Sequence, residues 1–539
     1  MFSMVPVFGP LWALLKYLLV AIWLEPSPIS KLDKGGDGSA STYDEWYALQ
    51  SELDAIRGVD DWVADDRDTH YDWHILRTLK RDLERCRRHG DVRGLCSQLR
   101  AQSSRNMCRV LSPALYRKSP IQTKRLIHDY VLEVRRCIIF MANRNAMLNP
   151  TTVVVSAQEK RQALYDMRKT LGRTGLVLQG GATISMCHLG VVKTLYLQHL
   201  LPQIVIGTAT GALIAALVGA TTDDRLLEVL TGNSINLDAF VRGRARRKDR
   251  RQNSWYQPAW FATFQRRYRR YRTTKHLFDI DVLQECARDN LGDLTFEEAY
   301  ARTGRILNIT VAMSEVSGTA QLLNYITAPH VLIWSAVMAS IATSKEMYAP
   351  VQLLCKNDTG AITRYFAADF FDGLSHHQTS SIRHEAPLQR IGELFNVNHF
   401  IVSQTRPYIA PFIRLQRAAD HHPPLGTLVR LVLSEVLHWL ETLNRLDFLP
   451  TFLQRILVDE VVPSFTPWSK LSITPQLEWR DVFAMFDTPT ATELRKWATR
   501  GEKSTWPFIC ELKVRCDIEI ELDTACINMH RRTPGLAEG

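Results

Sequence analysis

The pentapeptide from Gly207 to Gly211, which reads Gly-Thr-Ala-Thr-Gly, constrains this chain more than any other feature. Three β-branched residues, 204–206, precede it, and an apolar helical run, 212–219, follows it. A strand, a sharp turn and a helix in that order predict a nucleophile elbow, in which the G-x-S-x-G pattern holds a serine at the tip of the turn. Ala209 stands in the place of that serine. The sequence therefore predicts the scaffold of a serine acyl hydrolase without its nucleophile.

Two threonines flank this alanine, and each carries a hydroxyl. Successive residues on a tight turn point in different directions, so neither Thr208 nor Thr210 is expected to reach the position on which a base and an oxyanion hole converge. We interpret both as turn residues whose hydroxyls bond locally.

A second strand-to-helix turn lies upstream of the elbow. Its strand begins at Gly175, and its turn contains Gly180, Gly181, Ala182 and Ser185. Backbone N–H groups at such a turn, reinforced by a helix N-terminus, form an anion-binding site that suits a tetrahedral oxyanion. We therefore predict that this turn supplies the oxyanion hole.

This upstream turn resembles the G-G-G-x-x-G oxyanion loop of patatin-like lipid acyl hydrolases, with Ala182 and Ser185 in place of the third and fourth glycines. In that family the catalytic base is the aspartate of a downstream Asp-Gly motif, which Asp372 and Gly373 match. The resemblance covers nearly the whole chain beyond residue 40 and points to intracellular triacylglycerol lipases with an extra helical region before the core. It implies an α/β fold, a patatin-like three-layer core with a central, mostly parallel sheet, flanked by N-terminal and C-terminal helical regions. The matching stretches are 44–46, 115–116, 123–130, 291–300, 303–310 and 393–404.

The departures from the family pattern cluster where its chemistry is expected. Ala182, Ser185 and Ala209 each alter a loop of the site, and Leu374 is a bulky residue after the Asp-Gly pair. Glycines that allow a positive φ or a close backbone approach are not freely replaced by residues with a Cβ. We therefore expect a crowded oxyanion hole and a base, Asp372, that has no serine to activate. Hydrolysis by the Ser–Asp dyad is expected to be impaired.

The chain is expected to divide into five segments. Short β-branched runs that alternate with helical stretches indicate an α/β core, and an earlier region with Ile75, Leu79 and Leu83 at helical spacing indicates helices. The strand-like runs are 176–178, 204–206, 306–311 and 400–402. The segments are residues 1–28, an apolar membrane-associating segment; 29–41, a linker; 42–170, an N-terminal helical domain; 171–405, the patatin-like core; and 406–539, a C-terminal helical region.

Two features favour association with a lipid surface. Residues 4–24 are almost wholly apolar, but their uninterrupted helical part, 11–24, is shorter than the about 20 residues of a membrane span, so a single pass and an interfacial anchor both stay open. Arginines alternate with aromatic residues between Arg242 and Lys275, and the formal net charge is +10. Such a pattern can bind nucleic acid or an anionic lipid surface. The hydrolase scaffold beside an apolar segment favours lipid and no nucleic acid.

The compartment is indicated by the ten cysteines, which are scattered without a C-x-x-C pair or metal-ligand spacing. This usage is typical of a reducing compartment. We therefore expect an intracellular protein that associates with the endoplasmic reticulum membrane or with lipid droplets.

The expected function is binding of an acylglycerol or phospholipid, with an active paralogous lipase as a candidate partner. Two enzymatic alternatives stay open. One is an active lipid acyl hydrolase with a non-standard site, and the other is a lysophospholipid acyltransferase that uses His276 and Asp281, which fit an H-x₄-D pattern. No cofactor or metal is expected, because the histidine pairs 376–377 and 421–422 lack carboxylate or cysteine partners at metal spacing.

Overall fold

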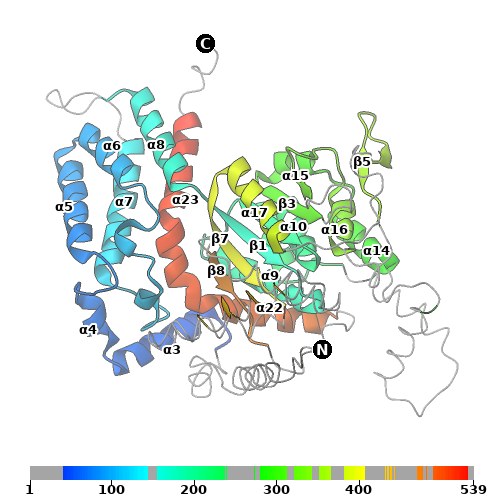
Figure 1. Cartoon of the computed structure of the whole chain (residues 1–539), viewed down its shortest axis with the longest axis horizontal. Coiled ribbons are helices and arrows are strands. Elements are labelled where there is room, and N and C mark those ends of the chain that lie inside the picture. Colours follow the sequence, from blue (N-terminus) through cyan, green and yellow to red (C-terminus); the bar gives the residue numbers. More distant parts are fainter. Residues whose placement is uncertain are drawn as a thin grey trace, which may run out of the picture.

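The fold combines an N-terminal group of helices, a central sheet and a C-terminal helical region (Figure 1). The computed structural model describes residues 40–143, 155–236, 280–311, 321–342, 351–365, 381–406, 470–477 and 490–531, together with the single positions 238, 272, 431, 434, 435, 438, 439, 442 and 481.

The N-terminal helices begin at well-defined caps and pack through their apolar faces. Thr42 and Glu45 form a reciprocal capping box at the start of α3. In α5 the predicted stripe is only partly correct, because Ile75 is 54% exposed and the neighbouring Leu76 is fully buried together with Leu83. Leu76 and Leu83 are seven residues apart and so lie on the same side of the helix, which packs against α7. The helices are α3 (Tyr43–Ile56), α4 (Val59–Ala64), α5 (Trp73–His89), α6 (Val92–Ala101), α7 (Arg125–Asn143) and α8 (Ala157–Leu171), with the short 3₁₀ helices η1 (Met107–Arg109) and η2 (Pro113–Tyr116).

The central sheet has six strands in the order β4-β3-β2-β1-β7-β8. All neighbouring pairs are parallel except β3 and β4, which are antiparallel. Each strand-like run expected from the sequence lies within one of these strands, which confirms the predicted mostly parallel sheet. The strands are β1 (Arg173–Gln179), β2 (Ile204–Thr208), β3 (Ile306–Val311), β4 (Gln321–Leu323), β7 (Val397–Gln404) and β8 (Lys470–Ile473).

Helices cover both faces of the sheet, which gives the three layers. Along β1, Leu176 and Leu178 belong to the core on one face, whereas Val177 belongs to the core on the other, because successive side chains of a strand alternate. The first face is covered by η3 (Ala182–Met186), α9 (Cys187–Leu197), α10 (Thr210–Ala220), α16 (Ile333–Ile341) and α22 (Ala491–Thr505), and the second by α17 (Ser381–Phe395). Burial on both faces explains why the central residues of β1, 176–178, are continuously apolar.

The C-terminal region contributes to both the sheet and the N-terminal helices. β8 extends the sheet by pairing with β7, a strand that the sequence did not predict in a region expected to be helical. The last helix, α23 (Ile509–Arg531), follows α22 through η6 (Trp506–Phe508) and lies between the N-terminal helices and the sheet (Figure 1). Val514, Leu522 and Ala525 of α23 are buried in the same core as α5, α6, α7 and α8. The N-terminal helices therefore share one hydrophobic core with the C-terminal helix α23.

All ten cysteines are free. Within the described ranges, no helix combines the length and the apolar character that crossing a membrane requires. The other helices and strands of the described residues are α11 (Asp223–Leu230), α14 (Ile280–Leu291), α15 (Phe296–Thr303), β5 (Leu354–Lys356) and β6 (Ile362–Arg364).

Candidate functional site

The two turns singled out from the sequence lie side by side at one edge of the sheet. β1 and β2 are parallel neighbours, and their register pairs Leu178 with Gly207 and Gln179 with Thr208. Both strands therefore end at the same level. Ligands of parallel α/β sheets bind at this carboxyl edge, so the fold brings the expected oxyanion turn and the elbow together where a site is expected.

The turn at the expected elbow is sharp at Ala209. Ala209 has φ 51° and ψ −129°, directly between β2 and α10. Its backbone N–H donates to the Ser340 hydroxyl over 2.9 Å, and that hydroxyl donates to the Thr310 carbonyl over 2.7 Å. Through these two hydrogen bonds, Ser340 of α16 and Thr310 of β3 hold the backbone of the turn in place.

Close backbone packing explains the glycines on either side of Ala209. A Cβ at Gly211 would lie 2.2 Å from the Leu178 carbonyl oxygen, and one at Gly207 would lie 2.5 Å from the Ala212 Cα. Distances this short cannot be relieved, because the obstructing atoms belong to the backbone. Both positions therefore require glycine whatever residue occupies the tip.

The upstream turn packs directly against the elbow. A Cβ at Gly180 would lie 2.7 Å from the Thr210 amide nitrogen and 3.0 Å from the Ala209 Cβ. The Gly181 N–H donates to the Thr210 hydroxyl over 3.1 Å. The two glycines that the chain retains are thus the ones in contact with the elbow.

Ala182 and Ser185, the positions where the resemblance leads us to expect glycines, behave differently. Ala182 has φ 52°, in the left-handed region that an L-residue rarely adopts. Ser185 is 1% exposed, and its hydroxyl donates to the Ala182 carbonyl over 2.6 Å within η3. Ala182 therefore keeps the turn in a glycine-like conformation at a cost in strain, and the Ser185 side chain bonds back into its own turn.

A buried histidine, which sequence reasoning treated only as part of a helix, anchors the strand ends beside this turn. His188 of α9 is fully buried, and its Nε2 lies 2.9 Å from the Gln179 carbonyl oxygen. Since a carbonyl only accepts, Nε2 carries the proton, and Nδ1 accepts from the Ser403 hydroxyl over 2.8 Å. Burial lowers the pKa of His188 to about 4. This neutral imidazole links the ends of β1 and β7.

Two further contacts complete the link between β1 and β7. The Thr405 hydroxyl donates to the Gln179 carbonyl over 2.9 Å, and Arg406 Nε donates to the Gly180 carbonyl over 3.0 Å. The stretch that matches the family ends at residue 404. Sequence analysis therefore did not single out Thr405 or Arg406.

The expected oxyanion turn is supported from behind by α22. Trp497 of α22 is buried with Ile184 and Cys187 in one small apolar cluster. The helices α9 and α22 cross in backbone contact, because a Cβ at Gly190 would lie 1.8 Å from the Ala498 carbonyl oxygen and one at Gly501 would lie 2.0 Å from that of Cys187. The C-terminal region thus helps to position the site.

Other candidates from the sequence lie apart from this site or beyond description. Asp281 is exposed in the first turn of α14. His276, Asp372, Gly373 and Leu374 lie outside the described residues. Over the ranges that the structure describes, His, Cys, Asp and Glu side chains form no group of three or more that could hold a metal ion. The assignment of Ala209 to the nucleophile position, of the Gly180 turn to the oxyanion hole and of Asp372 to the base stays a prediction.

In a comparison with known proteins, two segments of this chain each match a family model. Residues 36–169 match the model of a domain of unknown function, DUF3336, and residues 176–352 match that of patatin-like phospholipase. Triacylglycerol lipase ptl1 of Schizosaccharomyces pombe is 32% identical over 487 residues, which cover 89% of this chain and 82% of that protein.

Two other relatives extend beyond the matched region. Triacylglycerol lipase 5 of Saccharomyces cerevisiae is 27% identical, over 90% of this chain and 64% of its own length. A patatin-like phospholipase domain-containing protein of Cryptococcus neoformans is 31% identical over 89% of this chain, which spans about half of that relative, 53% of its length.

Proposed function

Because this chain belongs to the patatin-like phospholipase family and is related to fungal triacylglycerol lipases, we propose that it binds acyl lipids with the scaffold of such a lipase while its ester hydrolysis is impaired. The observation that carries this proposal is Ala209, a methyl group at the tip of an otherwise complete elbow. Removal of a serine nucleophile from another hydrolase lowers kcat by about 10⁶. A defect of that size leaves binding as the main activity of the site.

The hydroxyl groups nearest to Ala209 support this proposal, because each is engaged in a structural hydrogen bond. Thr208 donates to the Leu178 carbonyl over 3.5 Å, and Thr210 accepts from the Gly181 amide. Ser340 donates to a carbonyl of β3. An activated nucleophile needs a base as its hydrogen-bond partner, whereas the two sequence neighbours of Ala209 bond to backbone groups: Thr208 to a carbonyl and Thr210 to an amide.

Backbone strain at the two turns favours a binding role over a site without any remaining function. Ala182 and Ala209 both have positive φ, a conformation that costs about 1–3 kcal/mol for each residue. Such residues cluster at ligand clamps and active sites. The glycines at 180, 207 and 211 that the geometry requires are also present. The site therefore keeps the shape on which lipid contact depends.

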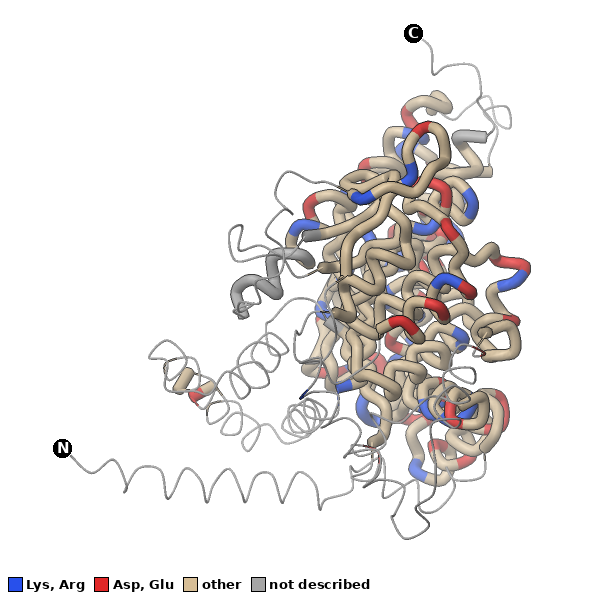
Figure 2. The backbone as a smooth tube through the Cα atoms, turned by 90° about the vertical axis from the view of Figure 1, so that its right-hand side faces the viewer, with Lys and Arg blue, Asp and Glu red and all other residues tan. Residues whose placement is uncertain are grey.

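We further propose that the lipid is an acylglycerol or a phospholipid, presented at the endoplasmic reticulum membrane or a lipid-droplet surface inside the cell, with an active paralogous lipase as a candidate partner. The apolar residues 4–24 and the basic-aromatic residues 242–275 would make the contact with the surface, and apart from position 272 both segments lie outside the described residues. Along the described backbone, Lys and Arg alternate with Asp and Glu (Figure 2). This mixed charge supports assigning the electrostatic attraction to residues 242–275.

The decisive experiment compares binding with turnover in the purified full-length protein. Triacylglycerol and lysophospholipid hydrolysis and fluorophosphonate labelling are measured beside binding to vesicles that contain triacylglycerol. We expect binding without turnover or labelling. Ala209→Leu, which places a bulkier side chain at the tip of the elbow, should weaken the binding, whereas the distant surface variant Arg88→Met should not. Hydrolysis by the unmodified chain that disappears in Asp372→Ala would refute impaired catalysis.

A further inference from the structure

A small cavity lies inside the N-terminal helices, far from the elbow along the chain. It has a volume of about 30 Å³ and is bounded by α6, α7, α8 and α23. Most of its wall is apolar and includes Val131, Val134 and Leu171. One end is polar, where Gln102, Ser103 and Arg105 contribute to the lining.

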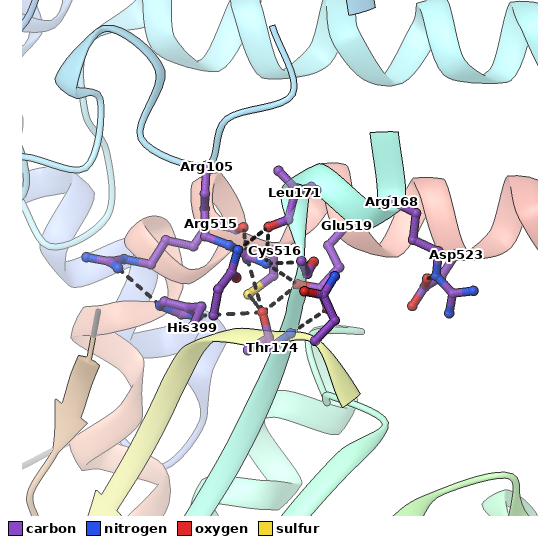
Figure 3. A network of polar contacts seen from close by, with 12 residues as sticks. Arg105, Arg168, Leu171, Thr174, His399, Arg515, Cys516, Glu519 and Asp523 are labelled. Atoms are coloured by element: carbon purple, nitrogen blue, oxygen red, sulfur yellow. Dashed lines mark hydrogen bonds and ion pairs between the residues drawn. The ribbon is translucent and has the colours of Figure 1, made fainter. Parts of the chain in front are cut away.

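Arg105 occupies the junction between the N-terminal helices, the sheet and α23 (Figure 3). Its Nη1 donates to the Thr174 hydroxyl over 3.0 Å and to the Arg515 carbonyl over 2.9 Å. Its Nη2 donates to Glu519 Oε2 over 3.0 Å and to the Gly172 carbonyl over 3.1 Å. The terminal nitrogens of the guanidinium are therefore fully used in holding three parts of the chain together.

The remaining donor of this guanidinium, Nε–H, has no partner among the described residues, although the Arg105 side chain is only 8% exposed. Buried polar groups are nearly always hydrogen-bonded, because an unpaired donor away from water is costly. An unpaired donor on a residue that lines a cavity points to a ligand with a hydrogen-bond acceptor.

Charge balance makes that ligand neutral. Glu519 already neutralises Arg105, and Glu511 accepts from the neighbouring Arg515 over 2.9 Å. His399, which accepts from Arg515 Nη1 over 3.1 Å, is held neutral because burial and the two arginines keep its pKa well below the usual range. An added anion would thus meet no unpaired cation among these groups.

Size excludes an acyl chain. Sites for drug-sized ligands have volumes of about 300–1,000 Å³, whereas a water molecule needs only about 10–15 Å³ of cavity measured in the same way as the 30 Å³ found here. A buried water needs two to four polar partners. Among the described residues, Gln102 Oε1 accepts only from the Tyr130 hydroxyl, over 3.3 Å, and Ser103 Oγ donates to the Leu99 carbonyl over 2.5 Å, so both oxygens can accept once more.

We propose that this cavity is a binding site for one or two ordered water molecules, which accept from Arg105 Nε and donate to Gln102 and Ser103. The bound water completes the hydrogen bonding of the residue that joins the DUF3336 region to β1 and to α23. It thereby stabilises the junction in a way that an apolar filling of the same volume could not.

The first test is a high-resolution crystal structure of the full-length protein, with and without xenon pressure. We expect density within hydrogen-bond distance of Arg105 Nε and no xenon in the cavity. Dry apolar cavities of proteins bind xenon. Xenon in this cavity, or a cavity without density in the unpressurised crystal, would overturn the proposal.

The second test is the thermal unfolding of the full-length variant Val134→Ile, which adds one methyl group to the cavity wall. If water occupies the cavity, the methyl group displaces it and leaves Arg105 Nε unpaired, so the Tm falls. The matched variant Val192→Ile, in the packed core of α9, gives the cost of an added methyl group where no cavity exists. The proposal requires the Tm of Val134→Ile to fall at least as far as that of Val192→Ile. A rise in Tm for Val134→Ile would mean that the cavity is dry.

Discussion

The Thr210 hydroxyl accepts a hydrogen bond from the Gly181 amide over 3.1 Å, and this bond joins the two turns of the site. Thr210 begins α10 directly after Ala209, and Gly181 follows β1. Serine hydrolases aim the amide of the residue after the nucleophile, together with amides of a second loop, at the oxyanion. One amide of the second loop therefore already has an acceptor here. A lipid carbonyl at this position would compete with the Thr210 hydroxyl.

The strain at Ala182 predicts that Ala182→Gly stabilises the protein. The left-handed conformation costs an L-residue about 1 kcal/mol or more, and glycine adopts it freely. We expect the free energy of unfolding to rise by about 1 kcal/mol, measured by urea denaturation with circular dichroism. The control is Ala301→Gly on the exposed side of α15, which should lower it by up to about 1 kcal/mol. Equal destabilisation by both variants would contradict strain at Ala182.

His188 predicts a loss of stability in mild acid. Burial lowers its pKa from 6.5 to about 4, so between these values the unfolded chain binds a proton that the folded protein does not. The free energy of unfolding therefore falls as the pH decreases from 6.5 to 4, by at most about 1.4 kcal/mol per pH unit for this group. Below pH 4 both states are protonated and this contribution becomes constant.

The variant His188→Gln tests this contribution, because glutamine can still donate to the Gln179 carbonyl but does not titrate. Urea unfolding across pH 4 to 6.5 should show a shallower dependence for the variant than for the wild-type chain. His399 keeps its own contribution in both proteins, since burial lowers its pKa as well. An unchanged slope would mean that His188 takes up its proton equally in the folded and unfolded states.

The ion pair between Arg105 and Glu519 predicts a large effect from either single substitution. The two side chains are 8% and 11% exposed and lie 3.0 Å apart. Arg105→Met or Glu519→Gln should each lower the free energy of unfolding by about 3–5 kcal/mol, because the partner charge is left buried. The double variant should lose less than the sum of the two. Arg88→Met, which removes an exposed pair with Glu84, should cost under about 1 kcal/mol.

Much of the fold could be predicted because its signals are local. The run 204–206 is wholly β-branched, and four of the six residues of 306–311 are β-branched, which is typical of buried strands. β8 could not be predicted, because its four residues, Lys470–Ile473, become a strand only through pairing with β7. The error at Ile75 has a similar origin, since the face of α5 that meets α7 depends on tertiary packing.

The site was predictable in its glycines and not in its supports. Gly180, Gly181, Gly207 and Gly211 form recognisable motifs within short stretches of sequence. His188 bonds to Ser403, 215 residues away, and Ala209 bonds to Ser340, 131 residues away. Contacts of that sequence separation leave no periodic or motif signal in a single sequence.

Association with a lipid surface predicts a graded response to truncation. Deletion of residues 1–28 should weaken but not abolish flotation with anionic vesicles, because residues 242–275 still supply electrostatic attraction. Charge reversal of the arginines in 242–251 should release the remainder, most clearly at low salt, where the attraction that it removes is least screened. A full-length protein that stays entirely in the soluble fraction would contradict both proposed contacts.

The residues at the two turns predict that introducing a serine at position 209 is not by itself sufficient for hydrolysis. Ala209→Ser places a hydroxyl on an elbow whose backbone is already formed, with Asp372 as its expected base. One oxyanion donor is worth about 2.7–4 kcal/mol, and the turn that should supply such donors contains Ala182 and Ser185. We therefore expect little esterase activity from Ala209→Ser and measurable activity when Ala182→Gly and Ser185→Gly are added, assayed with a short-chain ester and a fluorophosphonate probe. If the further variant Asp372→Ala abolishes that activity, Asp372 is identified as the base that activates the introduced serine. Substantial hydrolysis by Ala209→Ser alone would instead mean that Ala182, held at φ 52°, already presents a working oxyanion turn and that the missing serine is the single chemical defect of this chain.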